Sequence, residues 1–457
     1  MVKVISQETF NSVVKDNISE FDMTTEEAVK EAIEQFEAQG VDLSNIVKTA
    51  DMAQGKDPLI ICITSLQELY DNTAELDLIL PQLELFKNDC KKDLSRKILA
   101  AKEGAYPILL DILDKYSNDK EVVLSVLQSL NALMDGFPDL LNERGICMIG
   151  SLLSTRKEPS TISLVLQWCR KCCLNHEHNR QNIFENGIAD YLRILLDSEN
   201  VEYLADLCKV IRSLTLDDDV RVQVSNSHNR AKVLAVEFLC PITDLLSKHR
   251  ADNDIVNELL LTLSSLIVRN EFCAKVEEGG GIKFILDALT EFPEDEKICK
   301  SGLLLLKGLA GNDDVKVKIM QAGAPSLILI ALNKHMKSEA VSSAALSAIT
   351  VLALRSPSNC QTLFDEGAPE LILQTMKVHS KNSKVQRHGC WALRNMVSRN
   401  RELCAEFLKL GTEEILNAVL RQHKICEADA KAALRDLGCK VDLNEPWKGK
   451  GQGKVTH

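Results

Sequence analysis

The chain has 457 residues, 45% of them hydrophobic and 26% charged, with a formal net charge of −12. This composition is typical of a folded soluble protein, and the acidic balance argues against general nucleic-acid binding, which needs a basic surface. No apolar run reaches the ~18–20 residues of a membrane span, and the N-terminus lacks the apolar core of a signal peptide. The 15 cysteines are scattered over apolar positions and are expected to be reduced. We therefore expect an intracellular protein in the cytosol, with the nucleus as an alternative location.

Residues 1–55 are predicted to form a separate segment of amphipathic helices and a linker. One amphipathic stretch covers about Gln7 to Phe21. A second helix should begin at a capping box of Thr24 and Glu27 and end at Gly40, because glycine readily adopts the left-handed conformation that terminates a helix. These helices either cap the array that follows or bind a partner. Capping is slightly favoured, because the apolar end of an array would otherwise face water.

Residues 56–443 are predicted to form a solenoid of about eight repeats, because a glycine returns at intervals of 41 to 44 residues apart from one step of 93. Each glycine is expected to make a tight turn between a short first helix and a second helix, and Glu237 lies near the place where one is missing. Repeats of ~40–47 residues with helical texture are typical of HEAT and armadillo arrays, and three helices per unit favour armadillo. The recurring glycines are Gly104, Gly145, Gly187, Gly280, Gly323, Gly367 and Gly411.

The segment GCWALRNMVSRN at 389–400 resembles the third helix of the armadillo family, whose signature is a small residue followed by Trp391, Ala392, Leu393 and Asn395. The resemblance covers roughly residues 100–440 and implies an all-α fold, a right-handed superhelix of repeats. Further segments resemble one subgroup of that family and extend the likeness to the N-terminal helices; they are 26–50, 175–181, 216–222 and 269–273. The resemblance brings no established ligand or activity with it.

In importin-α and β-catenin, third helices line a concave groove that binds extended peptides through a ladder of asparagines, with tryptophans one turn before them. The resemblance implies such a groove here, yet only Asn395 fits the ladder well, with Asn131 as a second candidate. Tryptophan stands at Trp391 and is expected at the equivalent Trp168. The incomplete ladder argues against a typical nuclear-import receptor.

The later turns of the predicted third helices carry more basic than acidic residues, which is unexpected in an acidic chain. We expect them to form a basic stripe that accepts acidic or phosphorylated peptide segments, with arginines making bidentate contacts. The alternative is that they are ordinary solvated positions. The predicted partner-binding residues are Arg170, Lys171, Lys209, Arg212, Lys307, Arg387, Trp391, Arg394 and Asn395.

Two further groups of residues suggest chemistry. Cys169, Cys172, Cys173 and His176 share one helix face and could hold a soft metal, but one helix rarely supplies four ligands, so burial in the core is expected instead. The segment 216–236 begins with three aspartates and is longer than its counterparts. It is either a partner-binding loop or, as we favour, an acidic cap for the helix that follows.

The sequence contains no nucleophile, metalloprotease or cofactor fingerprint, so no enzyme activity, cofactor or metal is expected. The favoured function is a protein-interaction scaffold whose partners are other proteins, with no membrane and no expected nucleic acid. The alternatives are a nucleocytoplasmic transport adaptor and a metal or redox sensor that uses the cysteines. Residues 444–457 are predicted to be a basic flexible tail.

Overall fold

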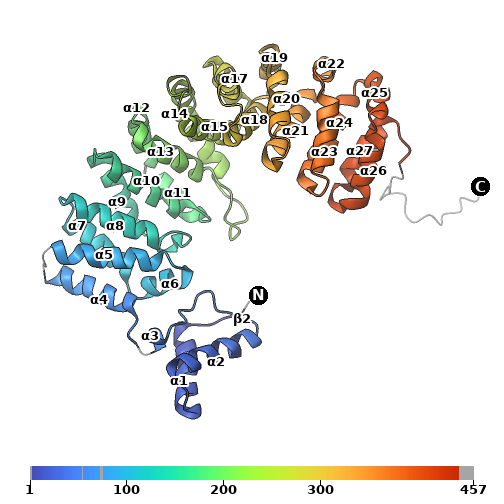
Figure 1. Ribbon diagram of the computed structural model, residues 1–457. Coiled ribbons are helices and arrows are strands. Elements are labelled where there is room, and N and C mark those ends of the chain that lie inside the picture. Colours follow the sequence, from blue (N-terminus) through green and yellow to red (C-terminus); the bar gives the residue numbers. More distant parts are fainter. Residues whose placement is uncertain (1–2, 54, 73–75, 442–457) are drawn as a thin grey trace, which may run out of the picture. The chain divides into compact units, whose positions relative to one another are not determined.

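The computed structural model describes residues 3–53, 55–72 and 76–441, and it confirms the predicted all-α fold (Figure 1). The chain divides into two compact units, residues 1–230 and 231–457, which are described separately below. The predicted tail 444–457 lies outside the described residues. Within the described part, no single helix is long and apolar enough to cross a membrane. One bent pair of helices reaches the necessary length and apolar character only when its two members are taken together.

The N-terminal segment contains α1 (Gln7–Phe21) and α2 (Thr25–Ala38). The predicted capping box is present, because the backbone N–H of Glu27 donates to Thr24 Oγ1 at 3.4 Å and the N–H of Thr24 donates to Glu27 Oε2 at 3.0 Å. Gly40 has a φ of 69°, as its role at the helix end requires. The chain before α1 and after α2 forms a short parallel pair, β1 (Lys3–Val4) and β2 (Val41–Asp42).

These elements enclose a small core of their own. Phe10 and Val14 of α1 pack with residues of α2 and with Leu43 and Ile46 beyond β2, and all of them are buried. At the start of the predicted linker the chain forms a short helix, α3 (Ala50–Ala53), which packs against α1 and α2. We call residues 3–47 the N-terminal module.

The first unit continues as an array of repeats whose inner helices pack on one another in sequence. The inner helices are α5 (Leu76–Cys90), α8 (Lys120–Leu133), α10 (Pro159–Cys173) and α13 (Val201–Leu214). The outer helices are α4 (Pro58–Asp71), α7 (Ala105–Lys115), α9 (Glu143–Thr155) and α12 (Ile188–Asp197). Short elements join the repeats: α6 (Leu94–Lys102), η1 (Pro138–Leu140) and α11 (Glu177–Glu185). Neighbouring inner helices make the most extensive contacts, so they form one continuous layer (Figure 1).

The second unit repeats this plan after the long helix α14 (Ser227–Lys248), which spans the boundary between the units. The inner helices are α15 (Asn253–Leu266), α18 (Glu296–Leu309), α21 (Glu339–Ala353), α24 (Ser383–Val397) and α27 (Glu427–Leu437). The outer helices are α17 (Gly281–Glu291), α20 (Ala324–Lys334), α23 (Ala368–Val378) and α26 (Thr412–Gln422). The short elements are α16 (Asn270–Glu278), α19 (Asp313–Gln321), α22 (Pro357–Asp365), η2 (Arg401–Leu403), α25 (Cys404–Lys409) and η3 (Lys424–Cys426). The described residues of the two units thus hold nine inner helices, one more than the expected eight repeats.

The recurring glycines behave as predicted, with one exception. Six of them have φ between 77° and 87° and stand immediately before an outer helix. Gly145 instead lies inside the first turn of α9, and an added Cβ would lie 2.1 Å from the hydroxyl of Tyr106. Gly145 is therefore needed for close packing and not for a turn. At the missing position, Glu237 lies within α14, because one continuous helix replaces the usual turn.

Candidate functional site

The inner layer of the first unit contains a hollow of about 270 Å³ in which four lysines converge. We call it the lysine pocket. Its walls come from the end of α5 and the residue after it, from α6, from the second half of α8 and from α10. The lining residues are Lys87, Lys91, Lys97, Gln128, Asn131, Ala132, Asp135, Leu164, Gln167 and Lys171. Because α8 packs closely on both α5 and α10, the backbone that positions the lining side chains is well packed.

Hydrogen bonds to backbone and amide oxygens hold three of these lysines over the pocket. The ammonium group of Lys171 donates to Asn131 O at 2.8 Å, and that of Lys97 donates to Asp135 O at 2.5 Å. The Lys87 ammonium donates to Gln128 Oε1 at 3.0 Å. These three acceptors are neutral, so they orient the ammonium groups without neutralising them; Lys87 and Lys171 each have one carboxylate nearby as well.

The carboxylates near the pocket are too few to neutralise it. Asp135 is the one acidic residue among its lining residues, and its Oδ1 lies 3.7 Å from Lys171 Nζ. Glu84, on the neighbouring face of α5, pairs with Lys87. Burial lowers the pKa of Lys171; Asp135 opposes this shift, whereas Lys97 adds to it. The pocket thus concentrates positive charge at a partly desolvated position.

Asn131 contributes an unused hydrogen-bond acceptor to this pocket. Its side chain is only 6% exposed, and its amide nitrogen donates to Leu127 O and Leu164 O, each at 2.9 Å. Its Oδ1 is buried and lacks a partner among the described residues. A buried carbonyl oxygen without a donor costs free energy, so a ligand N–H at this point would be stabilising.

The other predicted residues of the first unit lie on α10 and α13. Arg170 is partly exposed at the end of α10. Lys209 Nζ lies 3.4 Å from Asp206 Oδ1, and the other oxygen of Asp206 accepts a hydrogen bond from Gln167 at 2.9 Å. Arg212, in the last turn of α13, is also partly exposed.

In the second unit, aspartates of α27 pair with most of the predicted residues on α24. Arg387 Nε lies 3.3 Å from Asp429 Oδ2, and the indole N–H of Trp391 donates to Asp429 Oδ1 at 2.8 Å. Arg394 Nε lies 3.1 Å from Asp436 Oδ2. This part of the predicted stripe is thus largely neutralised by its own neighbouring repeat.

The two remaining predicted residues of the second unit differ in their surroundings. Asn395 donates its amide N–H to Thr350 O at 2.9 Å, which links α24 to α21. Lys307 is exposed on α18. The pKa of His388 is lowered mainly by the burial of its imidazole, and the positive charge of Lys307 lowers it further.

Trp168 lies in the core and not near the groove, where it was expected, whereas the expected burial of the three cysteines of α10 is confirmed. Trp168 is fully buried and does not line a surface. Cys169, Cys172 and Cys173 are also fully buried, while His176 caps the N-terminus of α11 by accepting from the N–H of Asn179. Within the described ranges, no three histidine, cysteine or acidic side chains are placed to hold a metal ion.

The aspartate segment was expected to cap the helix that follows it, but its Asp219 caps an earlier helix, α11. Asp219 Oδ2 accepts from the backbone N–H of Glu177 at 2.8 Å, at the positive end of α11. Asp218 pairs with the buried Arg180, and Asp219 pairs with Arg221 at 2.8 Å. The segment therefore folds back over α11.

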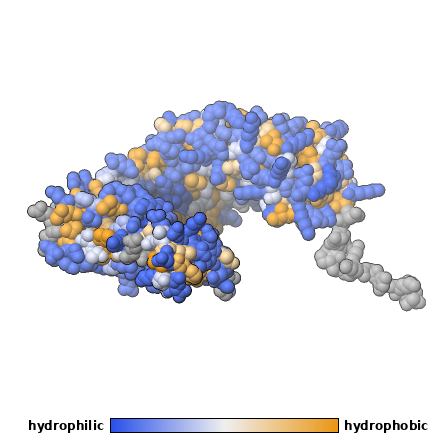
Figure 2. Space-filling model, turned by 60° about the horizontal axis from the view of Figure 1, so that its bottom comes forward, coloured by the Kyte–Doolittle hydropathy of each residue, from blue (hydrophilic) through white to orange (hydrophobic). Residues whose placement is uncertain are grey.

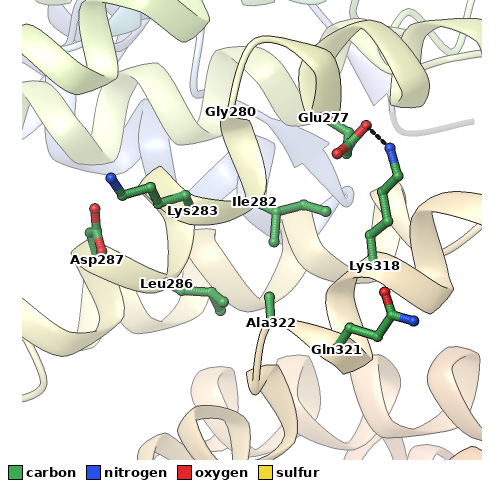
Figure 3. A pocket seen from close by; sticks show the side chains of 9 residues that line it. All are labelled: Glu277, Gly280, Ile282, Lys283, Leu286, Asp287, Lys318, Gln321 and Ala322. Atoms are coloured by element: carbon green, nitrogen blue, oxygen red, sulfur yellow. Dashed lines mark hydrogen bonds and ion pairs between the residues drawn. The ribbon is translucent and has the colours of Figure 1, made fainter.

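A different hollow lies between consecutive repeats of the second unit, lined by residues of α16, α17 and α19 and the turns beside them (Figure 3). Its rim carries an ion pair in which Lys318 Nζ lies 2.5 Å from Glu277 Oε2. Ile282 and Leu286 line it from α17. Its lining carries two lysines and two carboxylates, so it lacks the excess positive charge of the lysine pocket.

Reasoning from the sequence identified Lys171 and Asn131 but missed Lys87, Lys91 and Lys97. The glycine register begins at Gly104, so it gives no alignment for α5 and α6, which precede it. The spacing of Lys87 and Lys91, four residues apart at the end of a helical pattern, is the one signal in the sequence that indicated a shared face.

Comparisons with known proteins agree on the family. The ARMC6 family matches residues 62–456, and the armadillo repeat-containing protein 6 N-terminal domain matches residues 2–59. The chain is 38% identical to the armadillo repeat-containing protein 6 homolog of Drosophila melanogaster over the full length of both chains. It is 36% identical to armadillo repeat-containing protein 6 of Homo sapiens over 63% of this chain and 60% of the human one.

Solved structures share the fold at low sequence identity. An engineered protein superposes with a TM-score of 0.57 at 15% identity, covering 84% of this chain and all of its own. A second structure comes from work on a conserved phosphorylation switch that controls the interaction between cadherin and beta-catenin. It superposes with a TM-score of 0.54 at 14% identity and covers 83% of this chain and 69% of its own.

Proposed function

Because this chain belongs to the armadillo repeat-containing protein 6 family, we propose that it is a non-catalytic scaffold that binds extended segments of other proteins on its inner helices. The ligand segments are acidic or phosphorylated. The repeat fold supports this proposal, since stacked repeats present a long continuous surface and need no enclosed active site.

The observation that carries the proposal is the excess of cations on the inner layer of the first unit. The lysine pocket and the nearby Arg170 and Lys209 gather there, although the whole chain has a net charge of −12. A local basic surface on an acidic protein attracts acidic segments of its partners. Figure 2 shows a face covered mainly by hydrophilic residues, with hydrophobic ones scattered among them.

The second unit has a smaller part in this proposal. Its arginines on α24 are engaged by Asp429 and Asp436, so an acidic ligand would have to displace those aspartates. Reversing the charge of Arg394 should therefore weaken binding less than reversing the charge of Arg170.

The test is a screen of the full chain against a library of peptides from intracellular proteins. The double variant Arg170→Glu/Lys209→Glu should lose the acidic peptides that the wild-type chain retains. Arg193→Glu, a single reversal on the outer helix α12, is the control and should retain them. If the wild-type chain retains no acidic peptides, or if the double variant retains the same set, the proposal is wrong.

A further inference from the structure

The lysine pocket has more positive charge than a simple acidic side chain requires. Its lining holds four lysines and one carboxylate, Asp135. Basic residues in the last turn of a helix interact favourably with the helix dipole, which accounts for Lys87 on α5 and Lys171 on α10. Lys91 follows α5 and Lys97 lies in the first half of α6, so the dipole does not explain why they face the same hollow.

The surroundings of Lys171 indicate what would complete the pocket. Its side chain is 22% exposed, and burial lowers its pKa because the single carboxylate nearby offsets the lost hydration only in part. Two further cations, Lys97 and Arg170, lie close enough to add to this effect. A bound anion of more than one charge would balance several of these ammonium groups at once.

A phosphate monoester has this chemistry. It carries about −1.5 to −2 charges near pH 7 and three strong acceptor oxygens, whereas a glutamate carries one charge and two oxygens. Lysines bind phosphate as flexible point charges. The amide groups of Gln128 and Gln167 complete the wall of the hollow.

Asn131 favours a phosphate that is carried on a peptide. Its buried, unpaired Oδ1 is an acceptor, and the dianion of a phosphate monoester has no proton to donate to it. A peptide supplies backbone N–H groups beside its phosphorylated residue. The four lysines and the Asn131 acceptor together therefore fit a phosphorylated peptide segment.

We propose that the lysine pocket is a binding site for a phosphorylated serine or threonine side chain, with Lys87, Lys91, Lys97 and Lys171 around the phosphate and Asn131 Oδ1 accepting from the backbone of the same ligand. This inference rests on the proposed function, since it names the ligand group that the inner surface of the first unit selects. It extends the site to three lysines that the predicted stripe did not include.

The experiment presents one peptide library in three versions to the full chain, with serine, glutamate or phosphoserine at the central position. The phosphoserine version should be enriched at least ten-fold over the other two. The variant Lys97→Met/Lys171→Met should bind the phosphoserine and glutamate versions equally. Lys120→Met, at the start of α8 and outside the pocket lining, should behave like the wild type.

A second variant separates loss of phosphate binding from loss of folding. Lys91→Met changes an exposed side chain beyond the end of α5, so it should leave thermal unfolding unchanged and still reduce the preference for phosphoserine several-fold. A Lys91→Met chain with the full preference would overturn the assignment of that lysine and the pocket with it.

The other outcomes separate the two proposals. Equal binding of glutamate and phosphoserine peptides by the wild type and the double variant would overturn the phosphate site and leave the scaffold proposal intact. If no peptide of any version binds, the scaffold proposal fails. Binding of inorganic phosphate alone, lost in Lys97→Met/Lys171→Met, would then assign the pocket to a phosphate from another source and overturn the phosphopeptide ligand.

Discussion

Two buried arginines in the first unit share the carboxylate of Glu177, and Arg180 also pairs with Asp218. Arg230 Nη2 lies 2.7 Å and Arg180 Nε 3.0 Å from Glu177 Oε2, and both arginines are at most 2% exposed. Arg230 also donates to Leu214 O at 2.7 Å, which joins α11 to the end of α13. A buried ion pair adds little net stability, but the loss of one partner leaves a charge without compensation.

Arg230→Met should therefore lower the free energy of unfolding by about 3 kcal/mol, the lower end for breaking a buried ion pair, because Glu177 keeps Arg180 as a partner. Urea denaturation of the full chain, monitored by circular dichroism, measures this change. The matched control is Arg193→Met, which removes a 38% exposed arginine paired with Asp197 and should cost less than about 1 kcal/mol. Equal urea midpoints for the two variants would show that the buried ion pair contributes no more to stability than the exposed one.

The same carboxylate should make stability depend on pH in the acid range. Burial raises the pKa of Glu177, but hydrogen bonds from Arg230, from the Asn226 backbone and from Arg180 outweigh it and hold the pKa at about 2, below the ordinary 4.5. The ionised form is therefore favoured in the folded chain. Its contribution is complete above pH 4.5 and is lost as the pH falls towards 2.

Glu177→Gln removes this titration and should flatten the fall of the urea midpoint between pH 4.5 and 2, while lowering the midpoint at pH 7. The measurement is a series of urea titrations of both chains across that range. Parallel profiles would mean that other carboxylates cause the acid dependence.

At the scale of single elements, Gly145 shows how one residue type serves two purposes in the repeat. The turn glycines before α7 and α20 have open space where a Cβ would stand, so their value lies in the left-handed backbone. Gly145 has ordinary helical geometry, and its value is the room it leaves for Tyr106, which is buried on α7.

Gly145→Ala should destabilise the chain by about 1–3 kcal/mol through overpacking, and Tyr106→Phe should restore much of the loss by removing the hydroxyl that the new methyl group meets. Thermal unfolding of the two single variants and the double variant gives the coupling energy, which should exceed about 0.5 kcal/mol for residues in contact. An additive cycle would show that the cost arises elsewhere, for example in the helix backbone.

The repeat period and local signals predicted the elements well, because turns and caps depend on nearby residues. The bounds of α1 and the capping box of Thr24 are examples. Contacts between repeats were not predictable in the same way. The pairing of Arg394 with Asp436 joins residues 42 positions apart, and the lysine pocket draws on four elements, two of which precede the first glycine of the register.

At the scale of the whole molecule, the N-terminal module is more self-contained than a cap needs to be. Its core lies between α1 and α2, and Gln7 bonds to Val47 O at 3.0 Å, which closes the module on itself. A described link to the array is the exposed ion pair between Glu8 and Lys102, at 3.3 Å. Exposed pairs of this kind contribute about 0–1 kcal/mol, so the module adds little to the stability of the array.

Removal of residues 1–50 should therefore leave the array's unfolding temperature within about 2 °C of the full chain, a shift that corresponds to roughly 1 kcal/mol or less. Removal of residues 401–457 is the control; it strips α26 and α27 from α23 and α24, which they contact closely, and should lower the temperature far more. Differential scanning calorimetry compares the three chains. Should the N-terminal removal cost as much as the C-terminal one, the module is a cap after all; if stability is kept while partners are lost, the module is a second interaction element of the scaffold.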